Sequence, residues 1–314
     1  MNRLVAVVGL TATGKSALGL RLAQALDGEI ISCDSTAVYR GIDIGTDKVA
    51  RSDQLGIAHH LTDVVGPEDV YSAARYATEA AAVARAIIAR GRIPILVGGT
   101  GLYYRALVRG LFPGPARDGR TRMRLETVAG RRGVEWLHRW LMRVDPGSAR
   151  RIQPRDRKRL VRALEVYLLT GQNLTSHFDA TTSPLHDFRI RTLGLTMTRE
   201  ALRPRIARRV DVQFERGVVE EVQKLLDAGL PATAHALSGL VYRQIREFMA
   251  GVRDEAATRE LIIRENVQYA RRQMVWFRAE PDVRWLEGPG ESERVFEEAM
   301  QYVRDWERES VPRS

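Results

Sequence analysis

The sequence predicts an α/β fold, in which a parallel sheet flanked by helices is interrupted by a helical insertion. Three observations support this prediction. Short apolar runs alternate with helical patterns through residues 1–100, which is typical of strands buried on both faces of a parallel sheet. A glycine-rich turn joins the first strand pattern to the first helical pattern. Residues 120–171 form a helical, arginine-rich segment between two stretches that fit the sheet.

The first strand is expected over Leu4–Val8 and the first helix over residues 15–26. Between them, residues 9–16 fit the G-x-x-x-x-G-K-[ST] pattern of a phosphate-binding P-loop, so the core is expected to be P-loop NTPase-like. Backbone N–H groups of such a loop converge on phosphate oxygens, and the helix N-terminus adds positive charge. The residues expected to bind phosphate are Gly9, Thr11, Ala12, Thr13, Gly14, Lys15 and Ser16, with Lys15 on the terminal phosphate and Ser16 on Mg²⁺. A nucleotide and a prenyl diphosphate both satisfy this motif.

Further strands are expected over Glu29–Cys33, Ile93–Val97 and Arg189–Leu195. Asp34 follows the first of these strands, and Thr100 follows the second through two glycines. Ligands of parallel sheets bind at the carboxyl ends of the strands, so the phosphate loop, Asp34 and Thr100 should meet at one edge. The remaining helices of the core are expected over residues 72–90, 199–228, 239–250, 254–279 and 291–308.

A breaker-rich junction at residues 112–118 separates the core from the expected insertion. We place the core at residues 1–112 and 185–314 and the helical insertion at 113–184, with a loop over 172–187. Residues 117–162 carry 15 basic and five acidic side chains, a surplus equal to the net charge of the whole chain, +10. Such a block is typical of a surface that binds a nucleic-acid backbone, although a solvated helical face has the same composition. Trp136 and Trp140 are expected in the core of the insertion.

Composition narrows the class of protein. The chain has 314 residues, of which 44% are hydrophobic, enough for a buried core. It has no run approaching about 18 apolar residues and no leader pattern before the first strand, so we expect neither a membrane span nor a signal peptide. A single cysteine, Cys33, is compatible with a reducing cytoplasm. The adjacent His59 and His60 resemble a metal pair, but we expect no metal site there.

Eight segments of the chain form a recognisable set: residues 9–16, 31–35 with Tyr39, 43–48, 59–63, 71–74, 98–103, 159–165 and 272–277. Together they resemble the tRNA dimethylallyltransferase family, which prenylates the adenine just 3′ of the anticodon. The resemblance covers nearly the whole chain in order, and the combination of the P-loop with Ile-Ser-x-Asp-Ser and Gly-Gly-Thr-Gly-Leu-Tyr is specific. The family has a P-loop core with a helical insertion that grips the anticodon stem-loop. The resemblance implies dimethylallyl diphosphate as donor, Mg²⁺ as cofactor and tRNA as partner, and we expect the protein to act as a single chain.

The resemblance also implies roles for particular residues. Asp34 matches the family's general base for the adenine N6 amine, although an Asp here can also cap a turn or hold Mg²⁺ through water. Thr100 matches a residue that contacts the diphosphate near the breaking bond, and Arg209 matches a diphosphate-binding arginine. The positions that border the tRNA in the family are Asp34, Ser35, Thr36, Ala37, Thr100, Arg122, Lys158, Arg159, Leu160, Val161 and Arg162.

Two departures from the family pattern stand in the C-terminal half. Val241 replaces the usual Gly before Tyr242, and Asn266-Val267 replaces Thr-Arg. Three other functions are open from the residues: a small-molecule kinase, whose P-loop would look the same; a prenyltransferase on free adenine nucleotides, with less need of a basic insertion; and an RNA-binding module without catalysis. Intact Asp34 and Thr100 favour an enzyme.

Overall fold

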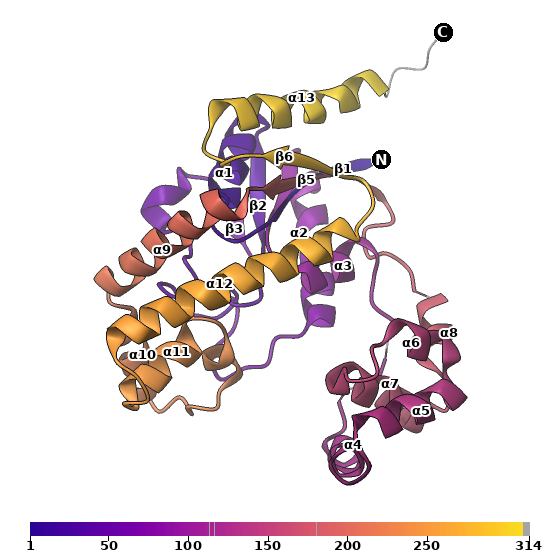
Figure 1. Ribbon diagram of the computed structural model, residues 1–314. Coiled ribbons are helices and arrows are strands. Elements are labelled where there is room, and N and C mark those ends of the chain that lie inside the picture. The colour runs from indigo at the N-terminus through magenta and orange to yellow at the C-terminus, as the bar shows by residue number, and fades with distance from the viewer. Residues whose placement is uncertain (113, 116, 180, 310–314) are drawn as a thin grey trace. The chain divides into compact units, whose positions relative to one another are not determined.

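Within the described residues, six strands form one sheet in the order β3-β2-β4-β1-β5-β6, and all neighbouring strands are parallel (Figure 1). This computed structural model describes residues 1–112, 114–115, 117–179 and 181–309. The chain divides into two compact units: unit 1 is Met1–Leu107 with the chain from Asp187 onward, and unit 2 is Val108–His186. The α/β fold class predicted from the sequence is confirmed. The expected insertion boundary at Pro113 lies outside the described residues.

Unit 1 contains all six strands, and the order of the sheet brings the first, second and fourth strands together. The strands are β1 (Asn2–Gly9), β2 (Gly28–Cys33), β3 (His59–His60), β4 (Ile93–Gly98), β5 (Phe188–Thr196) and β6 (Val283–Glu287). The helices of unit 1 are α1 (Lys15–Ala25), α2 (Ala73–Ala89), α3 (Gly101–Val108), α9 (Arg199–Glu215), α10 (Val218–Asp227), α11 (Tyr242–Met249), α12 (Glu255–Arg278) and α13 (Glu293–Glu309), with 3₁₀ turns at Arg51–Gln54 and His235–Ser238. The four expected strands are confirmed; β3, α3 and the edge strand β6 were not expected.

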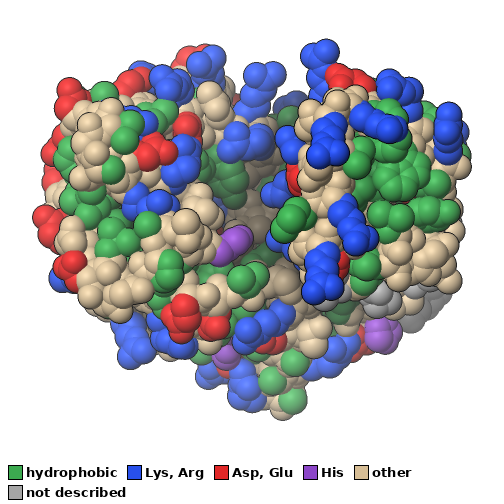
Figure 2. Space-filling view, turned by 90° about the horizontal axis from the view of Figure 1, so that it is seen from below, with side chains coloured by type: hydrophobic (Ala, Val, Ile, Leu, Met, Phe, Trp, Pro, Cys, Tyr) green, Lys and Arg blue, Asp and Glu red, His purple; other side chains and the backbone are tan. Residues whose placement is uncertain are grey.

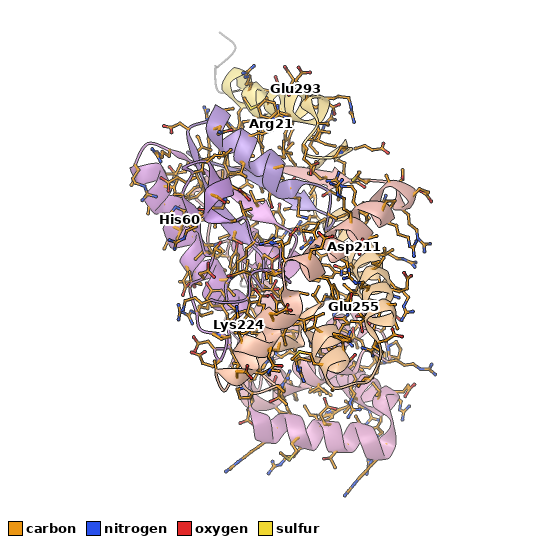
Figure 3. The ribbon with its side chains drawn as sticks, turned by 90° about the vertical axis from the view of Figure 1, so that its left-hand side faces the viewer. Arg21, His60, Asp211, Lys224, Glu255 and Glu293 are labelled. Atoms are coloured by element: carbon orange, nitrogen blue, oxygen red, sulfur yellow. The ribbon has the colours of Figure 1, made fainter. Side chains whose placement is uncertain are left out.

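Both faces of the sheet are buried because helices cover each of them. Val5 and Val7 point to one face, where α1 and α13 complete a core cluster. At the surface of that layer, Arg21 of α1 pairs with Glu293 of α13 at 2.5 Å (Figure 3). On the opposite face, the Tyr104 hydroxyl of α3 bonds the Thr192 hydroxyl of β5 at 2.8 Å. The buried Phe277 of α12 packs edge-on against the Tyr104 ring.

The expected helix over residues 199–228 is wrong in one respect: it is two helices, α9 and α10, because Gly217 adopts a φ of 86° between them. Helix α9 nevertheless packs along α12. Arg259 of α12 bonds Asp211 of α9 at 2.9 Å and Glu255 of its own helix at 2.7 Å. Figure 3 labels Asp211 and Glu255 on these two helices. This contact joins α12 to α9, and Gln273 of α12 contacts the phosphate loop at Thr11.

Unit 2 is a bundle of short helices with its own apolar core. Its helices are α4 (Gly119–Arg132), α5 (Val134–Val144), α6 (Pro146–Arg151), α7 (Arg157–Thr170) and α8 (Leu174–Asp179). The expected loop over 172–187 is therefore wrong at α8, where Asn173 caps the helix by accepting the Ser176 N–H at 2.8 Å. Trp136 and Trp140 are partly buried against this core, as predicted.

A buried carboxylate organises the basic surface of unit 2. Glu165 of α7 is fully buried and accepts hydrogen bonds from Arg122 at 3.0 Å, from Arg162 at 2.7 Å and from the Asp118 N–H at 2.9 Å. Burial acts to raise the pKa of Glu165, but these hydrogen bonds and the two positive charges outweigh it and hold the pKa below its ordinary value. Glu165 thus joins α4 to α7 through ionic contacts that are shielded from water.

We expect Glu165→Ala to lower the free energy of unfolding by about 2–4 kcal/mol at neutral pH, because it leaves two arginines and a backbone N–H without their acceptor. Since the folded pKa is lowered, the contribution of Glu165 is present at neutral pH and is lost as the pH falls below 4.5. Urea unfolding at pH 7 and pH 4 measures both effects. Glu126→Ala, which breaks an exposed pair with Arg157, is the matched control and should cost less than about 1 kcal/mol. Equal losses for the two variants would contradict the assignment.

Candidate active site

A cavity of about 650 Å³ in unit 1 opens at the carboxyl ends of β1, β2 and β4. These strands are neighbours in the sheet, so the segments that follow them converge. The phosphate loop follows β1, Asp34 follows β2, and the Gly98–Thr100 turn follows β4. The expected convergence of the three segments at one sheet edge is therefore found. Lining residues include Gly14, Lys15, Ser16, Asp34, Gly99 and Arg209.

The phosphate loop is held in shape by its own contacts. Gly14 has a φ of 85° immediately before α1, a left-handed conformation that glycine adopts without strain. A Cβ at this position would also lie 2.5 Å from the Glu291 carboxylate. The fully buried Thr13 hydroxyl donates to the Leu10 carbonyl oxygen at 2.8 Å, so this side chain stiffens the loop and does not face the cavity. Lys15, Ser16 and Gly14 line the cavity directly.

One buried side chain links the loop to the neighbouring turn. The Gln273 amide oxygen of α12 accepts the Thr11 N–H at 2.7 Å, and its amide nitrogen donates to the Gly99 carbonyl oxygen at 3.0 Å. A Cβ at Gly99 would lie 2.3 Å from that nitrogen, so the glycine gives the amide its space. The Thr11 N–H expected on phosphate therefore already has a protein acceptor. The sequence motif alone carries no sign of this contact, because its partners are 262 residues apart.

Lys15 donates to the Leu10 carbonyl oxygen beneath the loop. Burial and, to a lesser extent, the nearby Arg209 guanidinium lower the pKa of Lys15 to about 8, although the Asp34 carboxylate acts to raise it. A cation whose charge is disfavoured in the empty site gains most from an arriving anion. An anion that binds next to Lys15 would therefore favour the protonated lysine, so its binding would be coupled to lysine protonation.

Arg209, expected on the diphosphate, lies at the same cavity. It donates to the Thr11 hydroxyl at 3.0 Å and pairs with Asp47 at 3.1 Å. A second arginine of α9, Arg205, bonds the Ala12 carbonyl oxygen at 2.7 Å and the Glu291 carboxylate at 2.6 Å. Asp47, Arg205 and Glu291 were not identified from the sequence, because their place depends on how α9 and the C-terminal segment pack against the loop.

Asp34 shapes the turn that follows β2. Its Oδ1 accepts the Thr36 N–H at 2.8 Å, the Thr36 hydroxyl at 2.6 Å and the Ala37 N–H at 3.3 Å. The capping role left open from the sequence is thus present. Within the described residues these bonds all fall on one carboxylate oxygen, so the second oxygen, Oδ2, remains available at the cavity.

Thr100 lies directly before α3 and next to the Asp34 turn. Its Oγ1 accepts the Ser35 N–H at 3.0 Å, and its own N–H donates to the Cys33 carbonyl oxygen at 3.1 Å. These bonds fix Thr100 across the ends of β2 and β4. Its hydroxyl also donates to the Ser35 Oγ at 3.4 Å, so the Thr100 side chain both accepts from and donates to Ser35.

A second cavity of about 270 Å³ shares Asp34, Thr11 and Arg209 with the first. Tyr269 of α12 lines both cavities, and burial raises the pKa of its phenol to about 12, so the hydroxyl stays protonated.

Val241, one of the departures from the family pattern, lines the second cavity with φ 74° and ψ −62°, a strained combination for a branched residue. Of the other departures, the Asn266 side chain bonds the Ile262 carbonyl oxygen, and Val267 packs against a small apolar cluster.

The remaining expected RNA contacts lie in unit 2, on α4 and α7. Lys158 and Arg159 are exposed, and Arg159 forms a surface pair with Asp156 at 3.0 Å. Arg122 and Arg162 are partly buried on Glu165. The side chains of Leu160 and Val161 are buried, at 0% and 2% exposure, so they support α7 from within and do not present a side chain to a ligand. On the face of unit 2 seen at the right of Figure 2, Lys and Arg predominate over acidic side chains.

The fold and the site define an enzyme of the P-loop class. A family model described as IPP transferase matches residues 37–280. The chain is 44% identical over 299 residues to a tRNA dimethylallyltransferase from Geobacter metallireducens, covering 95% of this chain and 97% of that protein. It resembles the full-length tRNA isopentenylpyrophosphate transferase of Bacillus halodurans with a TM-score of 0.73 and 34% identity, covering 97% and 96% of the two chains.

A eukaryotic dimethylallyltransferase acting on tRNA shares the fold at a TM-score of 0.82 and 24% identity, covering 100% of this chain and 81% of that chain. The chain therefore belongs to the IPP transferase family of tRNA dimethylallyltransferases, and it is a prenyltransferase. Within the described residues, no helix combines the length and apolarity needed to cross a membrane.

The lowered pKa of Lys15 predicts pH-dependent ligand binding. Above pH 8 the lysine of the empty site loses its proton, so an anion must recruit one, and affinity should fall by up to about tenfold between pH 8 and pH 9. Titration calorimetry with an alkyl diphosphate ester, which is fully ionised in this range, measures the affinity and the proton uptake. Lys15→Met should bind weakly at both pH values. A wild-type affinity that does not change with pH would refute the coupling.

Proposed function

We propose that the protein transfers the dimethylallyl group of dimethylallyl diphosphate to N6 of the adenine 3′-adjacent to the anticodon, adenosine 37, of tRNA. The products are N6-isopentenyladenosine and diphosphate. The observation that carries this proposal is the meeting of Lys15, Asp34 and Thr100 at the ends of three adjacent parallel strands. Lys15 and Asp34 line one cavity, and Thr100 is bonded to Ser35, the residue next to Asp34. The names of the relatives supply the donor and acceptor classes.

The adenine amine is a weak nucleophile because its lone pair is delocalised into the ring. In the proposed reaction N6 attacks C1 of the allyl group, the C1–O bond breaks, and its electron pair leaves with the diphosphate oxygen. Asp34 accepts the N6 proton as the new bond forms, and its capped Oδ1 holds the carboxylate in place for this. Lys15 and Arg209 neutralise the diphosphate, and the Thr100 hydroxyl donates to the leaving oxygen.

Mg²⁺ belongs to this proposal as a companion of the diphosphate. Among the described residues, no three His, Cys, Asp or Glu side chains gather to form a metal site. Mg²⁺ usually keeps several waters and binds through substrate phosphates with few protein oxygens. The exposed Ser16 hydroxyl at the cavity fits that mode, and the bound metal would supply further neutralisation of the diphosphate. We also propose that the enzyme acts as a monomer in the cytoplasm.

The basic unit 2 is the proposed site for the anticodon stem-loop. Flipping a loop base out of its stack costs a few kcal/mol, less than for a duplex base, and contacts to the phosphate backbone can offset that cost. Lys158 and Arg159 carry exposed charge on α7, whereas the charge of Arg122 and Arg162 is largely committed to Glu165. We therefore assign phosphate contacts chiefly to Lys158 and Arg159.

The decisive test is prenylation of unmodified tRNA. The protein, Mg²⁺ and dimethylallyl diphosphate, without ATP, should add five carbons to adenosine 37, detected by mass spectrometry of nuclease fragments. Asp34→Asn should lower kcat by at least about 100-fold with little change in the KM for the donor, because only proton acceptance is lost. Prenylation of free AMP but not tRNA would move the acceptor to the nucleotide level, and phosphoryl transfer from ATP would replace the proposal with a kinase.

Charge reversal on α7 tests the RNA surface. The double variant Lys158→Glu/Arg159→Glu should raise the KM for tRNA by about tenfold or more and reduce its salt dependence, while the KM for the donor stays unchanged. The double variant Arg284→Glu/Arg304→Glu, two exposed reversals on β6 and α13 of unit 1, is the control with the same change in net charge. An equal effect of the two variants would show that total charge, and not this surface, governs tRNA binding.

A further inference from the structure

All three nitrogens of the Arg209 guanidinium have protein acceptors in this structure. Nε pairs with the Asp47 carboxylate at 3.1 Å, Nη1 donates to the Thr11 hydroxyl at 3.0 Å, and Nη2 donates to the Thr46 carbonyl oxygen at 3.3 Å. Two of these acceptors are neutral, but Asp47 carries a full negative charge at the edge of the phosphate cavity. Arg209, which we assign to the anionic substrate, therefore already forms an ion pair with a carboxylate of the protein.

The loop that carries Asp47 is fixed from behind. The Glu221 carboxylate of α10 accepts the N–H groups of Asp43 at 2.9 Å, Ile44 at 2.8 Å and Gly45 at 3.3 Å, and it also accepts the Tyr242 hydroxyl. Beside it, the buried Lys48 ammonium bonds Asp43 at 2.6 Å. These contacts leave Asp47 at the inner side of the loop.

The backbone of Asp47 is suited to this place. Its φ of 57° is left-handed, a conformation that Asp and Asn tolerate better than most residues, and its N–H bonds the Ile44 carbonyl oxygen at 3.1 Å. The backbone of the loop thus places Asp47 next to Arg209, and the two side chains pair there at 3.1 Å. Both charges are partly exposed, at 26% for Arg209 and 43% for Asp47, so the pair can exchange partners at modest cost.

Such a competitor matters because of how charge changes in the reaction. When the C1–O bond breaks, the oxygen keeps the electron pair, so the product diphosphate carries one more oxyanion than the esterified donor. A cavity lined by Lys15, Arg205, Arg208 and Arg209 would hold that product more tightly than the donor. A carboxylate that competes for one of these cations weakens the binding of the more highly charged species most.

We propose that Asp47 is a product-release residue that reclaims the Arg209 guanidinium from diphosphate. In the bound state Arg209 contacts the diphosphate; when the product leaves, Asp47 replaces it as the anionic partner. The direction of the reaction rests on the proposed function, but the competition itself applies to any diphosphate in this cavity.

The test is direct binding of inorganic diphosphate by titration calorimetry, with and without Mg²⁺ and without any tRNA or prenyl donor. Asp47→Asn keeps the left-handed backbone and removes the charge, so it should bind diphosphate about threefold to tenfold more tightly than the wild type. Asp43→Asn is the matched control, because its carboxylate lies in the same loop but faces Lys48. It should leave the affinity within about twofold of the wild type.

A double-mutant cycle identifies the partner. In an Arg209→Gln background, Asp47→Asn should no longer tighten diphosphate binding. Unchanged or weaker binding by Asp47→Asn overturns the proposal, and weakening seen only with Mg²⁺ would make Asp47 a magnesium ligand instead. Equal tightening by Asp43→Asn would reduce the effect to general electrostatics. Because no prenyl transfer is measured, a failure of the proposed function leaves this result interpretable.

Discussion

The site depends on one buried amide. Gln273 accepts a hydrogen bond from the phosphate loop and donates one to the turn before Thr100, so a single side chain of α12 sets the spacing between the ends of β1 and β4. In a low-dielectric interior both bonds are costly to leave unmade, which keeps the two segments in register. The amide fits only because residue 99 is a glycine: a Cβ at this position would lie 2.3 Å from the Gln273 amide nitrogen.

The sequence predicted those features whose residues lie close together along the chain, but not the contacts between distant segments. The P-loop pattern, the apolar strands and the polar residues at their ends lie within a few positions of each other, and they were sufficient to predict the convergence of Lys15, Asp34 and Thr100. The pairing of Arg209 with Asp47, by contrast, joins segments brought together only by folding. Helix α8 was not predicted because its cap, Asn173, lies two residues after Gly171 and precedes a stretch whose composition is typical of a loop.

Charge in unit 2 shows why composition overstates a binding surface. The segment 117–162 has a large surplus of basic residues. However, Arg122 and Arg162 form ion pairs with the buried Glu165 and thereby stabilise the helical bundle. Leu160 and Val161, which lie in the motif that resembles the family, are buried in the core. The resemblance to the family therefore points to helix α7. The burial of each side chain then distinguishes those that pack in the core of unit 2 from those that are exposed to solvent.

The sheet order has a consequence for how such an enzyme can change over evolution. Unit 2 is inserted between α3 and β5, while the central strand β1 pairs with β4 on one side and with β5 on the other, so every strand of the catalytic sheet is supplied by unit 1 alone. Unit 2 is part of a long crossover between β4 and β5, the two strands that flank β1. Insertions, deletions or replacements within unit 2 can therefore accumulate during evolution while the hydrogen-bonded framework of the sheet is inherited intact.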